Sequence, residues 1–132
     1  MVQRRRSRSP DTVRLGRSFE AAAEQHLRRL GFEFVARNVR FGRGEVDLIV
    51  RDAGVVVFVE VKGRTRGDRG HPLEAVTRRK RREVEAVAQW WIRSHGPAAG
   101  YRFDAVSVEA WGHPEGEQWC ITHVRDAWRH GE

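Results

Sequence analysis

Two carboxylates and a lysine lie near each other in the sequence, in a pattern that could hold a metal ion. Asp47 belongs to the apolar run 44–50, and Glu60 and Lys62 lie at the end of a second apolar run, 55–62. Two carboxylates that face each other repel unless a cation lies between them, and a divalent metal with oxygen ligands suits such a pair. The alternative is a cluster of ion pairs at the solvent-exposed end of a sheet.

The loop between the two runs decides whether the carboxylates meet. Both runs are rich in β-branched residues, and Asp52-Ala53-Gly54 separates them, which is typical of a β-hairpin. A loop of two or four residues places Asp47 opposite Glu60 on one face of the sheet. The same register places Glu45 opposite Lys62. A loop of three residues without a bulge would separate the two carboxylates.

A charged residue interrupts the apolar stripe of each predicted helix. Glu20 lies at the margin of the stripe of a helix over 15–30. Lys80 lies in the middle of the stripe of a helix over 71–93. A buried charge is costly unless it meets an opposite charge or a polar site. We therefore expect Glu20 and Lys80 to share one polar pocket near the two strand carboxylates, although Glu20 taken alone also suits the rim of the core.

The order of the elements is typical of a small α/β domain. We expect helices over 15–30 and 71–93, a final helical turn over 125–128, and strands over 32–37, 44–50, 55–62, 101–111 and 119–124. Because both helices have an apolar stripe, they should pack on one sheet. Residues 1–11 are rich in Arg and Ser and are expected to form a disordered basic tail, so that a single domain spans 12–132.

The chain is basic and therefore favours polyanionic partners. It has 25 Lys and Arg residues against 18 Asp and Glu residues, a formal net charge of +7. Such a charge favours nucleic acid first and an anionic membrane second. Arg43 precedes the first carboxylate run, and Arg64 and Arg66 lie in the glycine-rich segment 63–70. This segment leaves the candidate site and suits contact with phosphate, although an ordinary surface loop can have the same composition.

Several other classes of protein are disfavoured. The single cysteine, Cys120, excludes an internal disulfide and a multi-cysteine zinc site. No apolar run approaches the roughly 20 residues needed to span a bilayer, so no membrane segment is predicted. The arginines at the start of the chain are not followed by an apolar segment, which argues against an export signal. The predicted location is the cytoplasm.

Two longer motifs surround the candidate residues: Gly44-Glu45-Val46-Asp47-Leu48-Ile49 and Val57-Phe58-Val59-Glu60-Val61-Lys62. Glu20 precedes them, and Lys80 and Arg102-Phe103-Asp104 follow. In this order they resemble the PD-(D/E)XK nuclease superfamily, and more narrowly the YraN-type (UPF0102) family of endonuclease-like bacterial proteins. The resemblance covers nearly the whole chain beyond the tail. It implies a restriction-endonuclease-like core of the order α-β-β-β-α-β, with a mixed sheet flanked by helices.

The resemblance implies a role for each residue of the motifs. Asp47 and Glu60, with the backbone carbonyl of Val61, would hold Mg²⁺ or Mn²⁺. Lys62 would orient or help deprotonate the attacking water and stabilise charge on the phosphate. Glu20 corresponds to the helix acid that joins the metal site in Holliday-junction resolvase-like members of the superfamily. Carboxylate oxygens suit Mg²⁺, which keeps several waters and bridges to phosphate oxygens.

The activity that the resemblance implies is metal-dependent hydrolysis of DNA by an endonuclease, on branched or damaged structures in repair or recombination. Resolvase-like relatives act as homodimers. Contacts with the nucleic acid are expected at Arg43, Arg64, Arg66 and Lys80. The alternatives are a non-catalytic nucleic-acid-binding module with the same fold, and an interaction subunit whose partner supplies the substrate.

The chain departs from the family pattern at three positions. Phe19 stands where the family often has Gly, Gly63 stands where a Thr is usual, and Val46 replaces the superfamily's Pro. None of these departures removes a carboxylate or the lysine, so the expected chemistry is unchanged.

Overall fold

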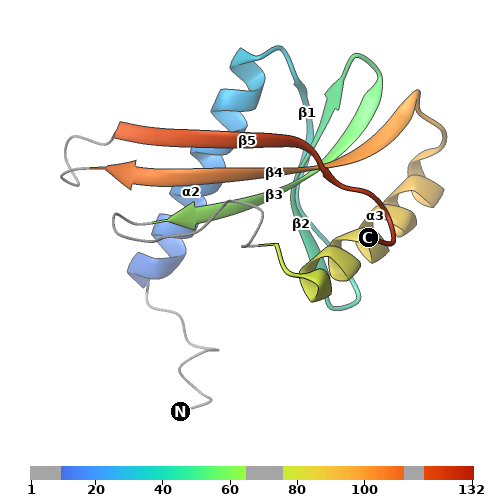
Figure 1. Cartoon of the computed structure of the whole chain (residues 1–132), viewed down its shortest axis with the longest axis horizontal. Helices are drawn as coiled ribbons and strands as arrows, with labels where there is room; N and C mark the ends of the chain where they lie inside the picture. The colour runs from blue at the N-terminus through green and yellow to red at the C-terminus, as the bar shows by residue number, and fades with distance from the viewer. Residues whose placement is uncertain (1–9, 65–75, 112–117) are drawn as a thin grey trace.

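The computed structural model describes residues 10–64, 76–111 and 118–132. In chain order the elements are α2 (Pro10–Arg29), β1 (Glu33–Phe41), β2 (Gly44–Asp52), β3 (Val55–Arg64), α3 (Arg78–His95), β4 (Gly100–Trp111) and β5 (Gln118–Trp128) (Figure 1). Among the described residues, no helix is long and apolar enough to cross a membrane.

The five strands form one mixed sheet in the order β1-β2-β3-β4-β5. The pairs β1–β2, β2–β3 and β4–β5 are antiparallel, whereas β3 and β4 are parallel. A parallel pair needs a long crossover connection, and α3 lies in that connection. The predicted α/β fold, with a helix, three strands, a second helix and two further strands, is therefore confirmed.

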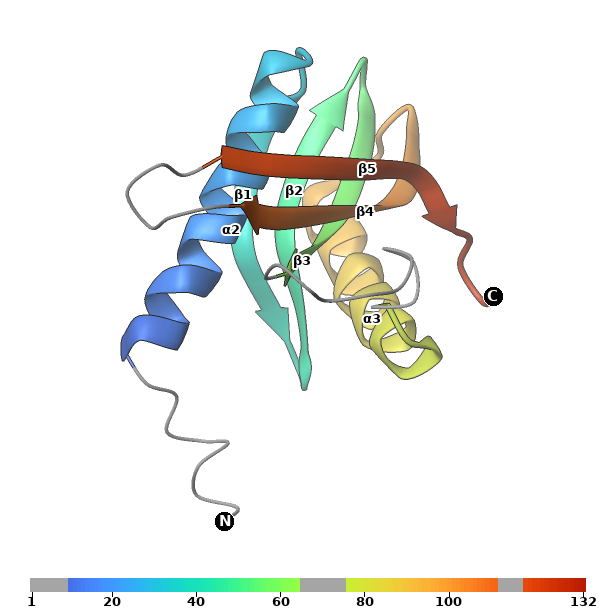
Figure 2. The ribbon, with the colours of Figure 1, turned by 60° about the vertical axis from the view of Figure 1, so that its left-hand side comes forward.

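The two helices cover opposite faces of the sheet and form two separate cores (Figure 2). Phe19, Ala23 and Leu27 of α2 pack on one face with a set of strand residues: Leu48, Val50, Val57, Val59, Val106 and Val108. Val84, Val87 and Trp91 of α3 pack on the other face with Val46, Ile49, Val56, Phe58, Phe103 and Ala105. Because strand side chains alternate, β3 supplies both cores.

The hairpin between β2 and β3 has a loop of two residues, Ala53 and Gly54, with φ angles of 51° and 87°. Positive φ at both loop residues is typical of the tight turns that match the twist of a hairpin. The ladder runs from Asp52↔Val55 to Leu48↔Val59. This register places Asp47 across from Glu60, so the predicted hairpin and its register are confirmed.

Some predicted boundaries differ from the structure. Strand β1 runs on to Phe41, which leaves only Gly42 and Arg43 in the turn before β2. The predicted helical turn over 125–128 is wrong, because β5 continues to Trp128. The backbone amide of Asp126 donates to buried Asp104 (3.0 Å), which holds this segment against β4.

The helix starts also differ. Helix α2 begins at Pro10, inside the predicted tail, and Pro is favoured in the first turn of a helix because its missing N–H needs no partner there. Helix α3 begins at Arg78, after the N-cap Thr77. The rest of the predicted tail, the predicted helix start at 71–72 and most of the glycine-rich segment lie outside the described residues.

Candidate active site

The carboxylates of Asp47 and Glu60 meet just beyond the end of the β2–β3 ladder. Asp47 Oδ2 accepts a hydrogen bond from the backbone amide of Val61, at 2.7 Å. This contact holds the Asp47 side chain against β3, where the Glu60 carboxyl group acts on it electrostatically. The register predicted from the hairpin therefore brings the two acids together.

Lys80 of α3 reaches the same pair. Its Nζ lies 3.2 Å from Glu60 Oε2, and the Glu60 side chain is 9% exposed. Lys80 lies in the first turn of α3, on the face that packs against the sheet. The prediction that this lysine meets an acid on the buried side of its helix is confirmed.

The electrostatics of the site follow from two acids against one cation. Burial and the neighbouring Glu60 carboxylate raise the pKa of Asp47 to about 9, although the Val61 amide and Lys80 act in the opposite direction. Burial alone would lower the pKa of Lys80, but Glu60 outweighs it and raises that pKa. Asp47 therefore carries a proton at neutral pH unless a further cation joins the site.

One oxygen of the site lacks a partner. Glu60 Oε1 is buried and has no hydrogen-bond donor among the described residues. A buried carboxylate oxygen without a partner is costly, and either a proton on Asp47 or a bound cation would satisfy it.

The donor set fits Mg²⁺ or Mn²⁺. The described residues contain no group of three or more His, Cys, Asp or Glu side chains arranged for a metal. Mg²⁺ does not need such a group, because it keeps several waters and is typically bound through one or two carboxylates together with substrate phosphate. Asp47 and Glu60 supply two carboxylates, one of them with an unpaired oxygen.

Glu20 of α2 contacts Asn38 of β1. It lines a hollow of about 350 Å³ beside α2, together with Ala21, Glu24, Arg37, Asn38 and Leu48. In the amide orientation that satisfies both contacts, Asn38 donates to Glu20 Oε1 (3.0 Å) and to Glu45 Oε2 (3.1 Å). The structure thus brings Glu20 to Asn38 and Lys80 to Glu60, from helices that cover opposite faces of the sheet, and one pocket shared by Glu20 and Lys80 stays a prediction.

Asn38 is a functional candidate to which no role was assigned from the sequence. Its φ angle is 52°, a backbone conformation that Asn adopts more readily than most residues. It lies between the pairs Arg37↔Leu48 and Val39↔Val46, and so across from Asp47. In the sequence Asn38 was predicted to follow the first strand, and Arg37-Asn38 is one of the pieces that resemble the family.

Glu45 also differs from its predicted position. The β2–β3 ladder ends at Leu48, so Glu45 does not pair with Lys62. It pairs with Arg40 of β1, at 3.7 Å between the carboxylate and the guanidinium nitrogen, and it accepts from Asn38. Together with Glu20 it places two acids on the α2 side of Asn38.

The basic residues predicted to contact phosphate or water differ in their exposure to solvent. Lys62, two residues beyond Glu60, is exposed and forms no ion pair with the described part of the chain. Arg43 is exposed in the β1–β2 turn, and Arg64 is half-buried at the end of β3. Arg66 lies outside the described residues.

A family model for the uncharacterised protein family UPF0102 matches residues 19–108, which include all of the described candidate residues. The chain belongs to this family. A UPF0102 protein of Chlorobium chlorochromatii is 38% identical over 118 residues, covering 88% of this chain and 92% of that protein. A UPF0102 protein of Clavibacter michiganensis is 44% identical over 114 residues, covering 86% and 94%. One from Anaeromyxobacter is 48% identical over 94 residues, covering 70% and 71%.

Two of the departures from the family pattern contact each other. A Cβ atom at Gly63 would lie 1.8 Å from Cδ2 of the Phe19 ring, far inside van der Waals contact. The ring of Phe19, which is 8% exposed, therefore occupies the space that a larger residue at position 63 would need. The large Phe19 on α2 and the small Gly63 on β3 thus fit together in this chain.

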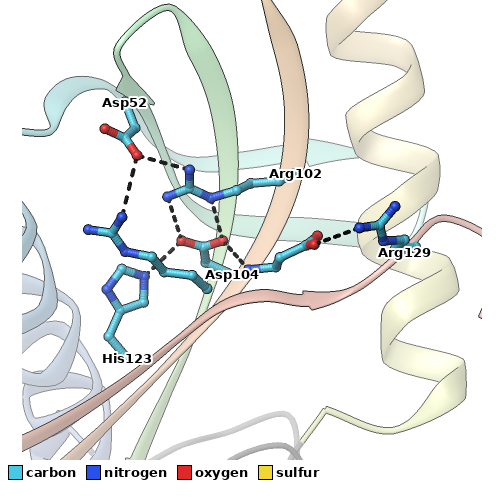
Figure 3. Close-up of polar contacts among 7 residues, drawn as sticks. Asp52, Arg102, Asp104, His123 and Arg129 are labelled. Atoms are coloured by element: carbon cyan, nitrogen blue, oxygen red, sulfur yellow. Dashed lines mark hydrogen bonds and ion pairs between the residues drawn. The ribbon is translucent and has the colours of Figure 1, made fainter.

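The Arg102-Phe103-Asp104 motif builds a second polar cluster (Figure 3). Asp104 is fully buried and accepts from Arg102 Nε (2.9 Å), His123 Nε2 (2.7 Å) and the amide of Asp126 (3.0 Å). Arg102 also donates to Asp52 at the hairpin end (2.9 Å). Burial would raise the pKa of Asp104, but these hydrogen bonds outweigh it and hold the pKa below its usual range. The cluster ties β5 and the hairpin to β4.

Proposed function

We propose that this protein is a metal-dependent endonuclease that hydrolyses DNA phosphodiesters, with the restriction-endonuclease-like core of the PD-(D/E)XK superfamily. The observation that carries the proposal is the Asp47–Glu60 pair, in which a buried Glu60 oxygen lacks a partner. A purely structural ion pair would be expected to satisfy its buried oxygens. A site that binds a dication leaves such an oxygen for the metal.

Each residue would have a distinct part in the reaction. Asp47 and Glu60, with the backbone carbonyl of Val61, would hold Mg²⁺ or Mn²⁺, which supplies Lewis-acid stabilisation of charge on the phosphate. Lys62 is exposed beside the pair and would contact the phosphate and orient the attacking water. Lys80 would hold the Glu60 carboxylate in position through its 3.2 Å contact.

Glu20 has a less direct part in this proposal. It contacts Asn38, which lies across from Asp47 on the neighbouring strand. Mg²⁺ in proteins keeps several waters, and a carboxylate beside the site can hold them. Glu20 would therefore act on the waters of the metal and not as a direct ligand.

Cleavage of defined DNA structures tests the proposal. Labelled linear, nicked, flapped and four-way DNA would be incubated with the protein in Mg²⁺, Mn²⁺ or EDTA. We expect cleavage of at least one structure that needs the metal, and a loss of about 100-fold or more in Asp47→Ala and Lys62→Ala. No cleavage of any structure by folded wild-type protein, or equal cleavage by Asp47→Ala, would overturn the proposal.

The same assay separates the two alternatives. A non-catalytic binding module would bind DNA in a salt-dependent way, without cleavage and without a response to EDTA or to Asp47→Ala. An interaction subunit would be active only when its partner is added.

A further inference from the structure

The N-terminal turns of α3 carry a cluster of positive charge. Residues 78–82 are all basic, and the first turn of the helix contains no acid. The positive end of a helix macrodipole lies at the N-terminus, so cations there oppose it and acids are favoured. This arrangement therefore weakens the helix unless an anion lies against it.

Two of these five basic side chains have partners within the protein. Lys80 is paired with Glu60 at 3.2 Å. Arg81 donates to the carbonyl of Val76 (3.1 Å), and its guanidinium lies 5.6 Å from the centre of the Trp128 ring. These contacts explain Lys80 and Arg81 without any ligand.

The other three cations have no comparable partner. Arg78 and Arg82 are exposed and form no hydrogen bond or ion pair with any residue in the described part of the chain. Arg79 is 87% exposed, and its only contact there is with Glu83 on the same helix, at 3.6 Å. Exposed pairs of this kind contribute little to stability.

The β1–β2 turn adds a fourth arginine beside them. A Cβ atom at Gly44 would lie 2.5 Å from the backbone carbonyl of Glu83, so this turn is pressed against α3. Arg43, next to Gly44, is exposed. We call Arg43, Arg78, Arg79 and Arg82 the arginine rim.

The arginine rim lies beside the candidate active site. Lys80, in the same helical turn, reaches Glu60. The Glu60 residue is buried, and its Oε1 has no partner in the described part of the chain, so a bound cation would stabilise it. A buried carboxylate oxygen without a partner among the described residues and a group of exposed arginines are thus neighbours. A metal ion together with the phosphates of a nucleic-acid strand satisfies both.

We propose that the arginine rim binds the phosphate backbone of the nucleic acid next to the phosphodiester at Asp47 and Glu60; the position of that phosphodiester rests on the proposed function. Guanidinium groups suit phosphate because they donate two parallel hydrogen bonds. Contacts of this kind position a strand without reading its sequence. The rim therefore sets affinity and the path of the strand.

The salt dependence of DNA binding tests the rim. Binding of a labelled DNA duplex would be measured in EDTA, so that no cleavage occurs, for wild type and for Arg78→Gln/Arg79→Gln/Arg82→Gln. The matched control is Arg28→Gln/Arg51→Gln/Arg93→Gln, which removes the same charge from exposed positions elsewhere. We expect the rim variant to lower the slope of log K against log[salt] by about 2 to 3, since each lost phosphate contact is worth about 0.9.

Stability gives a second readout that excludes misfolding. The rim variant should melt at a higher temperature than wild type, because it removes cations from a helix N-terminus, whereas Arg93→Gln removes one from the last turn of the same helix and should not. Weaker binding together with higher stability supports the rim. An unchanged slope in the rim variant, or equal slopes in the two triple variants, would overturn it.

The outcome is separable from that of the proposed function. If wild type cleaves DNA and the rim slope is unchanged, hydrolysis stands and the rim is wrong. If no DNA is cleaved but the rim variant lowers the slope of log K against log[salt], the arginine rim does bind phosphate, and the protein is a non-catalytic nucleic-acid-binding module. Adding Arg43→Gln to the rim variant should lower the slope by about 0.9 more.

Discussion

Asp47, which is half-buried, and Glu60, which is buried, place two carboxyl groups against one lysine, and this excess of one acid governs the chemistry of the site. Without a further cation, the state of lowest free energy has a proton on Asp47, as its raised pKa indicates. With a dication, Asp47 can ionise, because the charges of the metal and Lys80 together exceed those of the two carboxylates. The Asp47–Glu60 pair would therefore bind either a proton, on Asp47, or a metal ion.

The raised pKa of Asp47 predicts a pH-dependent stability. The folded chain holds a proton that the unfolded chain releases above pH 3.8, so stability falls as pH rises from there towards about 9. The loss is at most about 1.4 kcal/mol per pH unit. Asp47→Asn should flatten this dependence and be more stable than wild type at pH 8. Urea unfolding at pH 6, 7 and 8, without metal, measures it; parallel pH curves for the two proteins would contradict it.

The ion pair between Lys80 and Glu60 predicts a second effect. Lys80→Met would leave Glu60 buried without its cation, and breaking a buried pair costs more than the pair contributes. Because Lys80 is about a third exposed, solvent screens part of this cost, and we expect a loss of about 1–2 kcal/mol. Denaturant unfolding measures it. The double variant Lys80→Met/Glu60→Gln should recover most of the loss, and a double variant as unstable as the sum of the singles would argue against the pairing.

At the scale of elements, α2 and β3 fit together through Phe19 and Gly63. Gly63→Thr should cost about 2 kcal/mol or more, because the new side chain would overlap the Phe19 ring. Phe19→Ala should cost about 3 kcal/mol by leaving a cavity. In Phe19→Ala/Gly63→Thr the two changes compensate, so the double variant should be about 1–3 kcal/mol more stable than the sum predicts. Strict additivity in thermal or urea unfolding would show that the contact is unimportant.

Strand β5 depends on Asp104 in a similar way. Asp104→Asn would remove the charge that Arg102, His123 and the Asp126 amide all bind, at a cost of about 3 kcal/mol or more. Because the pKa of Asp104 is lowered, its contribution is present above pH 3.8 and is lost as pH falls further. Hydrogen exchange should show faster exchange in β5 than in α3. Uniform acceleration across both elements would contradict this anchoring role.

The sequence predicted those elements whose local signals agree with the fold. Asp52-Ala53-Gly54 demands a tight hairpin, and alternation in 55–62 fixes its faces, so the register of Asp47 and Glu60 followed. Lys80 was predictable because a lysine inside an apolar stripe needs an acid. The contact of Glu20 with Asn38 was not predictable, because a helical wheel gives the buried side of a helix but not which face of the sheet it covers.

The end of β5 could not be predicted from local sequence patterns. Residues 125–128 carry no strong strand signal, and long-range contacts make them part of β5: the bond from the Asp126 amide to Asp104 and the pairing of Trp128 with Phe103. Asn38 was missed for a similar reason, since its bridge to Glu20 and Glu45 exists only after α2, β1 and β2 have packed. Contacts between elements distant in sequence decide both features.

In the whole molecule, α2 and α3 lie on opposite sides of the sheet (Figure 2), and the candidate site lies where the Lys80 side chain of α3 reaches Glu60 of β3. The acids of this site come from β2 and β3, and Lys80 and most of the arginine rim come from α3. A basic chain with a small acidic site beside an arginine surface suits a metal ion and a nucleic-acid strand that bind together. The metal ion and the nucleic-acid strand should therefore each strengthen the binding of the other.

Direct titration with Mn²⁺ tests the central claim, that Asp47 and Glu60 form a metal site, without relying on cleavage. Calorimetry at pH 7 in buffers of different ionisation enthalpy would give the affinity and the number of protons released. We expect one site, release of close to one proton as Asp47 ionises, and at least about tenfold weaker binding in both Asp47→Asn and Glu60→Gln. Binding that is absent in wild type, or unchanged in both variants, would contradict the account.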